Sequence, residues 1–396
     1  MINLIKRISI SELLVVVFLF TLHLFFVFFT KSNLGFITLF PKNLFLFQLL
    51  EISFSNPSFF IYIVSFLNFL LIFWLANIFF GKSGFLYPLI VYSFSPWIFY
   101  SVAFNSHYVF LLFIVLLIIS GIVFVEKGKR GALFLLFFAI FLGMVSDFFL
   151  FFLIPVFFIL YLIIFGSESV RKFIYPTVFS LFVLFVFLFF FLFKLRPGFF
   201  AIAANEFGIF DDPGFMNMVN TYRGESSQEG FVFLSRLVEN KYFLGLEFLI
   251  LRFLSFITPA TYFTSQERFF GFSFSPPIFI GFLIPFLYGL YRLISDKKAR
   301  KFLFLSLILI LPSFFSSLSI NLSRLIIFSP IIIFAISYGF IGLLNFKKSK
   351  APVVLVWISI FLLIFQLFLT VYDIKLKEKE RFLRYYNFDS SYKIKI

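Results

Sequence analysis

The sequence contains no cysteine and only two histidines, His23 and His107. Without thiols the chain has no disulfide framework, no thiolate metal site and no cysteine nucleophile. Two histidines are too few for a histidine metal cluster. His23 lies inside the first apolar run, where we expect it to face a neighbouring helix. We therefore expect no cofactor, with a divalent cation as the one alternative left open.

Charge is also scarce. Only 13% of residues are charged, against about a quarter in soluble domains, and the mean hydropathy is +1.08. These values exclude an ordinary soluble domain. Apolar runs of roughly 18 residues or more, each long enough to cross a bilayer, recur along the chain. They predict an all-α polytopic integral membrane protein with membrane lipids as its surroundings.

The basic residues explain the net charge of +15 without a nucleic-acid partner, because they lie in short loops between the apolar runs. That distribution predicts a cytoplasmic N-terminus and an extracytoplasmic C-terminus. We expect the protein to lie in the cytoplasmic (plasma) membrane. Lys6 and Arg7 precede a run too long for a cleaved signal peptide. The eleven predicted spans are 9–30, 57–80, 84–101, 107–125, 131–147, 148–165, 173–195, 273–294, 302–320, 324–344 and 352–372.

This arrangement predicts a single membrane domain, 1–372, followed by a short basic extracytoplasmic tail, 373–396. Two outer loops follow from it, a short one at 31–56 and a long one at 196–272. The weak run at 35–50 contains Pro41, Lys42 and Gln48. It is therefore interpreted as an interfacial or re-entrant piece of the first loop.

Three stretches carry a family resemblance. They are FSPWIFYSVAFNSHYVFLLF (94–113), the long loop beginning FDDPGFMNMVNTYRG at Phe210, and LPSFFSSLSINLSRLIIFSPIIIFAISYGF (311–340). In this order and spacing they resemble polytopic glycosyltransferases of the GT-C class, namely the protein-O-mannosyltransferases and the lipid-A aminoarabinose transferase-like enzymes. The resemblance covers most of the chain.

The resemblance implies a site at the outer leaflet and a polyprenyl-phosphate-linked sugar as donor. A carboxylate in the first outer loop would deprotonate an acceptor hydroxyl, and a cation would hold the departing phosphate. This chain departs from the family pattern at that loop, which lacks the usual acidic pair and contains Glu51 as its only acid. Val102 and Asn105 stand where the class often has Arg and Glu.

Two acids are candidates for the catalytic base. Glu51 is the surrogate in the first outer loop, with a solvated or helix-capping acid as the alternative. Asp147 lies between two spans, where an N-cap is the alternative. Asp211 and Asp212 precede Pro-Gly, which favours a tight turn, and a metal site is the weaker interpretation.

Three arginines are candidates for binding the donor phosphate. Arg324 opens a span, where a guanidinium can grip a phosphate through two hydrogen bonds, and snorkelling to lipid headgroups is the alternative. Arg268 lies where the long loop returns to the membrane. Arg252 interrupts an apolar run, for which we favour an amphipathic interfacial helix.

The sequence therefore supports three hypotheses. The first is an active membrane glycosyltransferase. The second is a catalytically degenerate GT-C-fold protein that binds a lipid or a protein partner. The third is a lipid or solute transporter, which would require ionisable residues inside the spans.

Overall fold

The computed structural model describes the chain as helices, with no strand among the described residues. The chain divides into two compact units, which we describe separately. The first comprises 1–147, 262–306 and 323–396, and the second comprises 148–261 and 307–322. The described residues are 9–34, 57–104, 106, 108–126, 132–146, 186, 213–228, 240–264, 276–296, 324–345 and 351–376.

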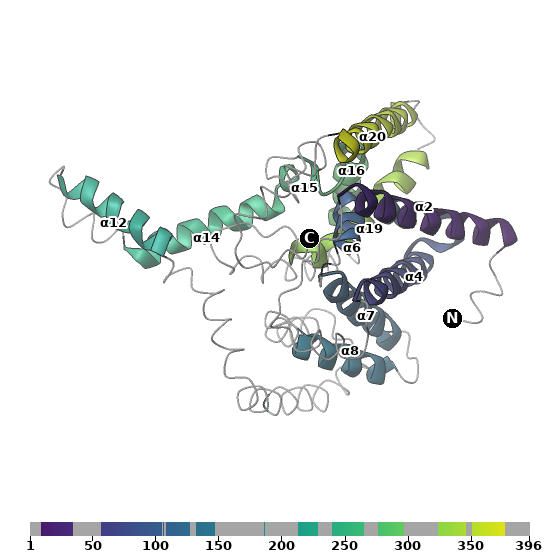
Figure 1. Ribbon diagram of the computed structural model, residues 1–396, viewed down its shortest axis with the longest axis horizontal. Helices are drawn as coiled ribbons and strands as arrows, with labels where there is room; N and C mark the ends of the chain where they lie inside the picture. The colour runs from purple at the N-terminus through teal and green to yellow at the C-terminus, as the bar shows by residue number, and fades with distance from the viewer. Residues whose placement is uncertain are drawn as a thin grey trace. The chain divides into compact units, whose positions relative to one another are not determined.

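Four of the six described helices in the N-terminal part of the first unit are 15 residues or longer (Figure 1). Helix α2 begins with a reciprocal capping box, in which the Glu12 carboxylate accepts from the Ser9 N–H at 2.8 Å and the Ser9 hydroxyl accepts from the Glu12 N–H at 3.2 Å. Pro57 occupies the first turn of α4, where its missing N–H is not needed. The helices are α2 (Ile10–Leu34), α4 (Pro57–Gly84), α7 (Tyr108–Glu126) and α8 (Ala132–Ser146). They coincide closely with the predicted segments 9–30, 57–80, 107–125 and 131–147.

The predicted span 84–101 corresponds to two helices, not to one continuous helix. It is broken into α5 (Leu86–Ser93) and α6 (Pro96–Ala103), whose axes differ by 54°. Ser95 takes an extended backbone conformation, φ −80° and ψ 113°. The cause is Pro96, whose ring disfavours helical geometry in the preceding residue.

The C-terminal part of the first unit contains three longer helices and short helical turns. The predicted span 273–294 starts later than expected, because Pro276 and Pro277 precede its first helical turn. The elements are α15 (Ala260–Phe263, of which the last two residues belong to this unit), η3 (Ile280–Phe282), α16 (Leu283–Ser295), η5 (Arg324–Phe328), α19 (Ser329–Leu344) and α20 (Ala351–Leu376). The predicted segments 148–165, 173–195 (apart from Val186) and 302–320 lie outside the described residues.

Helices α16 and α19 approach each other at backbone distance. A Cβ atom built on Gly289 would lie 1.8 Å from the Ala335 carbonyl oxygen, and one built on Gly339 would lie 1.8 Å from the Pro285 carbonyl oxygen. Small residues of this kind allow helices in a bilayer to gain contacts where no hydrophobic effect drives them together. These glycines therefore fix the crossing of the two helices.

The second unit contributes α12 (Pro213–Gln228) and α14 (Lys241–Ile257). The Asn240 side chain caps α14 by accepting from the N–H groups of Tyr242 and Phe243 at 2.9 and 2.8 Å. The turn expected at Asp-Asp-Pro-Gly is wrong for its Pro-Gly half, because Pro213 is already the first residue of α12.

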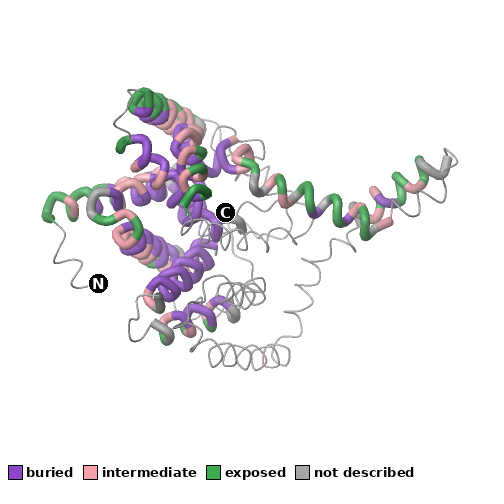
Figure 2. Tube along the Cα trace, turned by 180° about the vertical axis from the view of Figure 1, so that it is seen from behind, coloured by how far each residue is buried: buried purple, intermediate pink, exposed green. Residues whose placement is uncertain are grey.

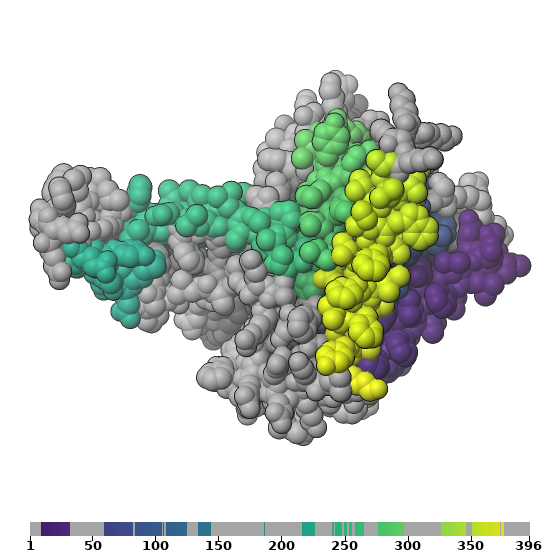
Figure 3. Space-filling model, turned by 90° about the horizontal axis from the view of Figure 1, so that it is seen from above, coloured from purple at the N-terminus to yellow at the C-terminus, as the bar shows by residue number. Residues whose placement is uncertain are grey.

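The long apolar helices of the first unit differ in how far they are buried (Figure 2). Among the described residues, four helical stretches are long and apolar enough to cross a membrane: Ile10–Lys31, Phe59–Gly81, Ile326–Leu344 and Ala351–Tyr372. The bent pair α5–α6 adds a fifth if it counts as one span. In the space-filling view, α20 and α2 form part of the outer surface (Figure 3), and large apolar side chains such as Phe18 and Phe361 are exposed on them. The described part of the chain is consistent with an all-α membrane protein.

Candidate functional site

Most of the predicted site residues lie outside the described residues. These are Glu51, Asp147, Asp211, Asp212 and Arg268. Arg324 is the first residue of η5, in the first unit, and Arg252 is in the middle of α14, in the second. The candidate site is therefore built from other residues.

A buried polar layer lies among α2, α4 and α5. His23 is fully buried, and its Nε2 lies 3.1 Å from the Ser65 hydroxyl on α4. The Tyr92 hydroxyl on α5 donates to the Ser65 carbonyl oxygen at 3.2 Å and lies 3.4 Å from the Ser65 hydroxyl. The rings of His23 and Tyr92 are in contact, with centroids 5.2 Å apart. The prediction that His23 faces a neighbouring helix is confirmed.

Two further hydrogen bonds from buried side chains extend these contacts, the second of them to α7. The Ser93 hydroxyl donates to the Leu19 carbonyl oxygen at 3.1 Å, and the Asn68 amide donates to the Val109 carbonyl oxygen at 3.0 Å. Each such bond is worth roughly 0.6 kcal/mol inside a membrane. Together they connect α2 to α5 and α4 to α7, so the polar layer helps to hold these helices in register.

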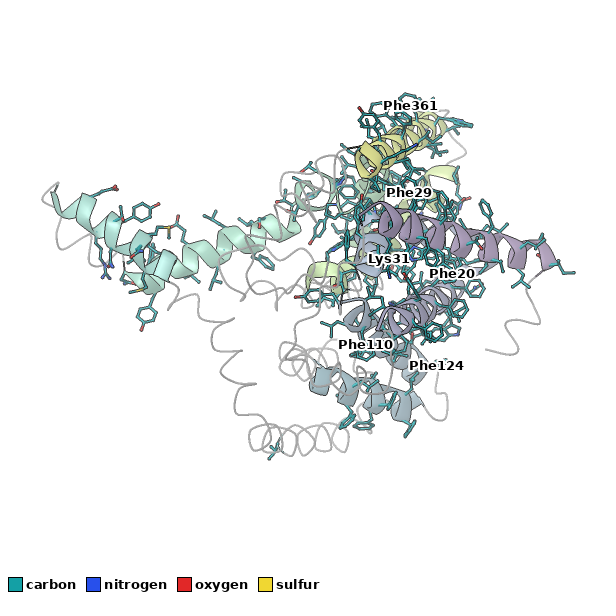
Figure 4. The ribbon with its side chains drawn as sticks, viewed as in Figure 1. Phe20, Phe29, Lys31, Phe110, Phe124 and Phe361 are labelled. Atoms are coloured by element: carbon teal, nitrogen blue, oxygen red, sulfur yellow. The ribbon has the colours of Figure 1, made fainter. Side chains whose placement is uncertain are left out.

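An ammonium group lies beyond this layer, at the C-terminal end of α2. Lys31 is buried except for 9% of its surface, and its Nζ donates to the Tyr62 hydroxyl at 3.1 Å. The same Nζ lies 5.3 Å from the centre of the Tyr62 ring. Figure 4 places Lys31 on α2. Eight residues separate it from His23, a rise of about 12 Å along the helix.

The broken helix α5–α6 forms a second polar feature, because its break is bonded to the segment before α16. The Pro277 carbonyl oxygen accepts from the Trp97 N–H at 2.9 Å and from the Ser95 hydroxyl at 3.3 Å. The Tyr262 carbonyl oxygen accepts from the Ile278 N–H at 2.9 Å. These bonds satisfy backbone groups that the break removes from the helix, as a membrane interior requires.

Three aromatic rings pack together at this junction. The Tyr262 ring centroid lies 5.7 Å from that of Trp97 and 6.0 Å from that of Phe328, the last residue of η5. Trp97, Tyr262 and Phe328 therefore meet in one buried cluster, although more than 200 residues of chain separate the first from the last.

Among the described residues, the hydroxyls of Tyr262 and of Ser329, which follows Phe328, have no hydrogen-bond partner. Tyr262 is 2% exposed and Ser329 is 1% exposed. Neither the Tyr262 phenol oxygen nor the Ser329 hydroxyl oxygen forms a hydrogen bond with the described residues. Burial raises the pKa of Tyr262, so its hydroxyl stays a protonated donor. An unpaired buried polar group costs roughly 1–3 kcal/mol, and His23 Nδ1 and Asn68 Oδ1 in the polar layer are also buried without a partner among the described residues.

The described residues hold no group of three His, Asp or Glu side chains that could bind a metal ion. The arrangement instead offers hydrogen-bond donors in apolar surroundings. The sequence analysis did not single out Tyr262 or Ser329. The one feature that could have pointed to them is a hydroxyl next to proline or aromatic residues in an apolar stretch.

No protein-family model, no curated protein and no solved structure matches this chain. Its function must therefore be argued from its own residues.

Proposed function

We propose that the chain is a GT-C-type membrane glycosyltransferase that transfers a sugar from a polyprenyl-phosphate donor to an extracytoplasmic acceptor. The proposal includes eleven spans in the plasma membrane, with the N-terminus cytoplasmic and the C-terminus outside. The observation that supports it most is the junction of Trp97, Tyr262 and Phe328. Each of the three segments that meet there belongs to a stretch that resembles this class.

The proposed reaction assigns distinct roles to the charged candidates. Glu51 or Asp147 takes the proton from the acceptor hydroxyl as its oxygen bonds to the anomeric carbon of the sugar. The bond between that carbon and the phosphate oxygen breaks, and the polyprenyl phosphate leaves as an anion. Arg324 binds this phosphate, with Arg268 and Arg252 as further candidates.

A transfer assay tests this function. The purified protein in lipid nanodiscs is incubated with labelled polyprenyl-phosphate hexoses, pentoses and aminoarabinose, together with membrane extracts that contain acceptors. We expect transfer from one donor, a loss of at least about 100-fold in Glu51→Gln or Asp147→Asn, and weaker donor binding in Arg324→Ala. Arg223→Ala, on α12 of the second unit, is the matched control and should change neither quantity.

The same assay separates an enzyme from a degenerate member of the class. Donor binding without turnover, unchanged by Glu51→Gln and Asp147→Asn, would identify a lipid-binding protein or a scaffold for a partner protein. Neither binding nor turnover with any donor would contradict the glycosyltransferase proposal.

A second candidate function is lipid or solute transport, and the polar layer favours it. His23 is an ionisable side chain fully buried inside a long apolar helix, and α5–α6 is a broken helix next to it. Both features are frequent at the binding sites of transporters. The test is substrate flux into proteoliposomes. A flux that falls in His23→Gln and persists in Thr21→Ala, an exposed position on the same helix, would favour transport over glycosyl transfer.

A further inference from the structure

Helix α14, in the second unit, carries a stripe of exposed apolar side chains. Phe243, Leu246, Ile250 and Leu254 are each more than half exposed. Their spacing of three, four and four residues places them on one face of the helix. Figure 2 shows exposed residues along the length of α14. We call these four residues the apolar stripe. An exposed apolar patch of this kind marks a surface that binds something other than water.

Helix α12, in the same unit, has a different surface. Its exposed residues include Asn217, Asn220, Thr221 and Glu225, together with Tyr222, whose ring carries a hydroxyl. Its apolar Val219 is fully buried. This is the distribution expected of a helix that faces water. The two helices therefore present opposite chemistry, and the apolar surface belongs to α14.

The length and charge of α14 show how such a surface meets a membrane. Its 17 residues span about 25 Å, less than the roughly 30 Å of a hydrocarbon core. It also carries Lys241, Glu247 and Arg252. Among the described residues, α14 is not one of the helices long and apolar enough to cross a bilayer. A short helix with an apolar face and charged residues lies along a membrane surface.

The chain itself holds α14 near the membrane. The helix ends at Ile257, and Tyr262 follows five residues later. Tyr262 belongs to the first unit, which contains the helical stretches able to cross a membrane, and its ring is buried against Trp97. Five residues reach at most about 18 Å when fully extended. The C-terminal end of α14 is therefore tethered within that distance of Tyr262.

We propose that the apolar stripe of α14 binds the membrane surface, with the helix in the plane of the membrane and the four side chains among the acyl chains below the headgroups. The sequence favours an interfacial helix around Arg252 but does not say which face meets the lipid, and the exposed stripe assigns that face. Two basic residues and one acidic residue give the helix a formal charge of +1. Apolar contact, and not attraction to anionic lipid, therefore provides the binding.

Single cysteines test the position of the stripe. The chain contains no cysteine, so a fluorophore attached to Leu246→Cys, Ile250→Cys or Leu254→Cys reports on one site. The full-length protein is placed in phosphatidylcholine nanodiscs that contain phosphatidylcholine spin-labelled near the headgroup. We expect lipid quenching at the stripe to exceed that at the control, Asn220→Cys on α12, at least about twofold, because an interfacial helix buries its apolar face by 5–10 Å. Iodide, a quencher in water, should act in the opposite order.

A charge in the stripe tests whether the stripe is what binds. Ile250→Asp, introduced together with Leu246→Cys, should lower lipid quenching and raise iodide quenching at the label. The matched control is Thr221→Asp, at an exposed position on α12, in the same Leu246→Cys background. It should change neither value.

The results separate lipid from other occupants of the stripe. Lipid quenching at the three stripe positions that Ile250→Asp lowers supports the inference. Three results overturn it. Iodide quenching without lipid quenching would place the stripe in water. Protection from both quenchers would mean that protein covers it, as a second copy or another segment of the chain would. Lipid quenching that is unchanged by Ile250→Asp, or equal at Asn220→Cys, would show that the stripe does not bind the membrane.

This surface does not depend on the proposed glycosyltransferase activity, since the readout is the position of a helix and not the transfer of a sugar. A protein that transfers no sugar and shows lipid quenching at the stripe loses the proposed function and keeps the surface. A protein that transfers sugar with its stripe in water keeps the function and loses the surface.

Discussion

Helices α19 and α20 are neighbours in the chain, and both are apolar, but they occupy opposite environments. In the most apolar 18 residues of each stretch, 89% are buried in Ile326–Leu344, which joins the end of η5 to α19, and 17% are buried in Ala351–Tyr372 of α20. Figure 2 shows the same contrast between α19, which is mostly buried, and α20, which is largely exposed.

Residue size accounts for the difference better than polarity does. Helix α19 carries Ala335, Gly339 and Gly342 where α16 approaches, so the two backbones nearly touch. Helix α20 contacts its neighbours through a narrower stripe that includes Val356, Ser359 and Thr370, all buried. Its Gln366 side chain accepts a hydrogen bond from the Ile280 N–H. In a bilayer, apolar side chains are as well solvated by lipid tails as by other side chains. Close packing at small residues therefore decides which apolar helix lies in the core.

The largest expected effect is a clash at the α16–α19 crossing. Gly339→Leu places side-chain atoms where the Pro285 carbonyl lies, and the backbone of α16 cannot move aside alone. We expect a loss of about 3 kcal/mol in unfolding free energy, at the upper end for overpacked cores. Val354→Leu on α20, at a position that is 54% exposed, is the control and should change stability little. The measurement is denaturant unfolding in micelles.

A charge on α20 tests whether lipid covers its exposed face. Phe361 is 68% exposed near the middle of the helix (Figure 4). Phe361→Lys should disfavour membrane insertion by roughly 2.5–3 kcal/mol, and Phe361→Leu should not. The check is the fraction of full-length protein recovered in the membrane. Equal recovery of both variants would contradict a lipid-facing α20.

Truncation at matched isoleucines compares the two helices directly. Ile332 on α19 is fully buried, and Ile364 on α20 is 62% exposed. The unfolded helices would also lie in the hydrocarbon of the membrane, so Ile332→Ala loses mainly packing contacts and little transfer free energy. We expect it to lower the unfolding free energy by about 2 kcal/mol. Ile364→Ala should cost under about 0.5 kcal/mol. Similar costs in the two variants would show that α20 is packed against another chain.

The smallest effect concerns hydroxyls. Ser65→Ala removes the group between His23 and Tyr92, so contacts between α4 and two other helices weaken. We expect roughly 0.6 kcal/mol, the average for such bonds in a membrane. Thr21→Ala removes an exposed hydroxyl bonded to its own helix and should cost less. A larger loss from Thr21→Ala would mean that the polar layer does not stabilise the bundle. Unfolding of both variants in the same detergent gives the comparison.

The positions of helices could be predicted from sequence because length and hydrophobicity decide them. The segments 9–30, 57–80 and 352–372 match α2, α4 and α20 to within a few residues. The break at Ser95 was missed, although Pro96 gives a local signal, because the apolar run continues across it. Apolar content alone says nothing about backbone hydrogen bonds.

The candidate site could be predicted only in part. His23 was expected to face another helix, but its partners depend on residues 42 and 69 positions further along the chain. The missing partner of the Tyr262 hydroxyl is a property of packing, and no residue pattern reports it. Arg324 was expected to open a membrane span, and the structure places its backbone at the start of the 3-10 helix η5.

The bonds to Pro277 bear on how the protein is made. Ser95 and its acceptor are 182 residues apart, so the ribosome completes α5 and α6 long before Pro277 exists. Until then, the N–H of Trp97 must bond to water, to lipid headgroups or to the insertion machinery. We therefore expect residues 86–103 to stay near the membrane–water boundary during synthesis. They would reach their final depth in the membrane only after the C-terminal half has been inserted.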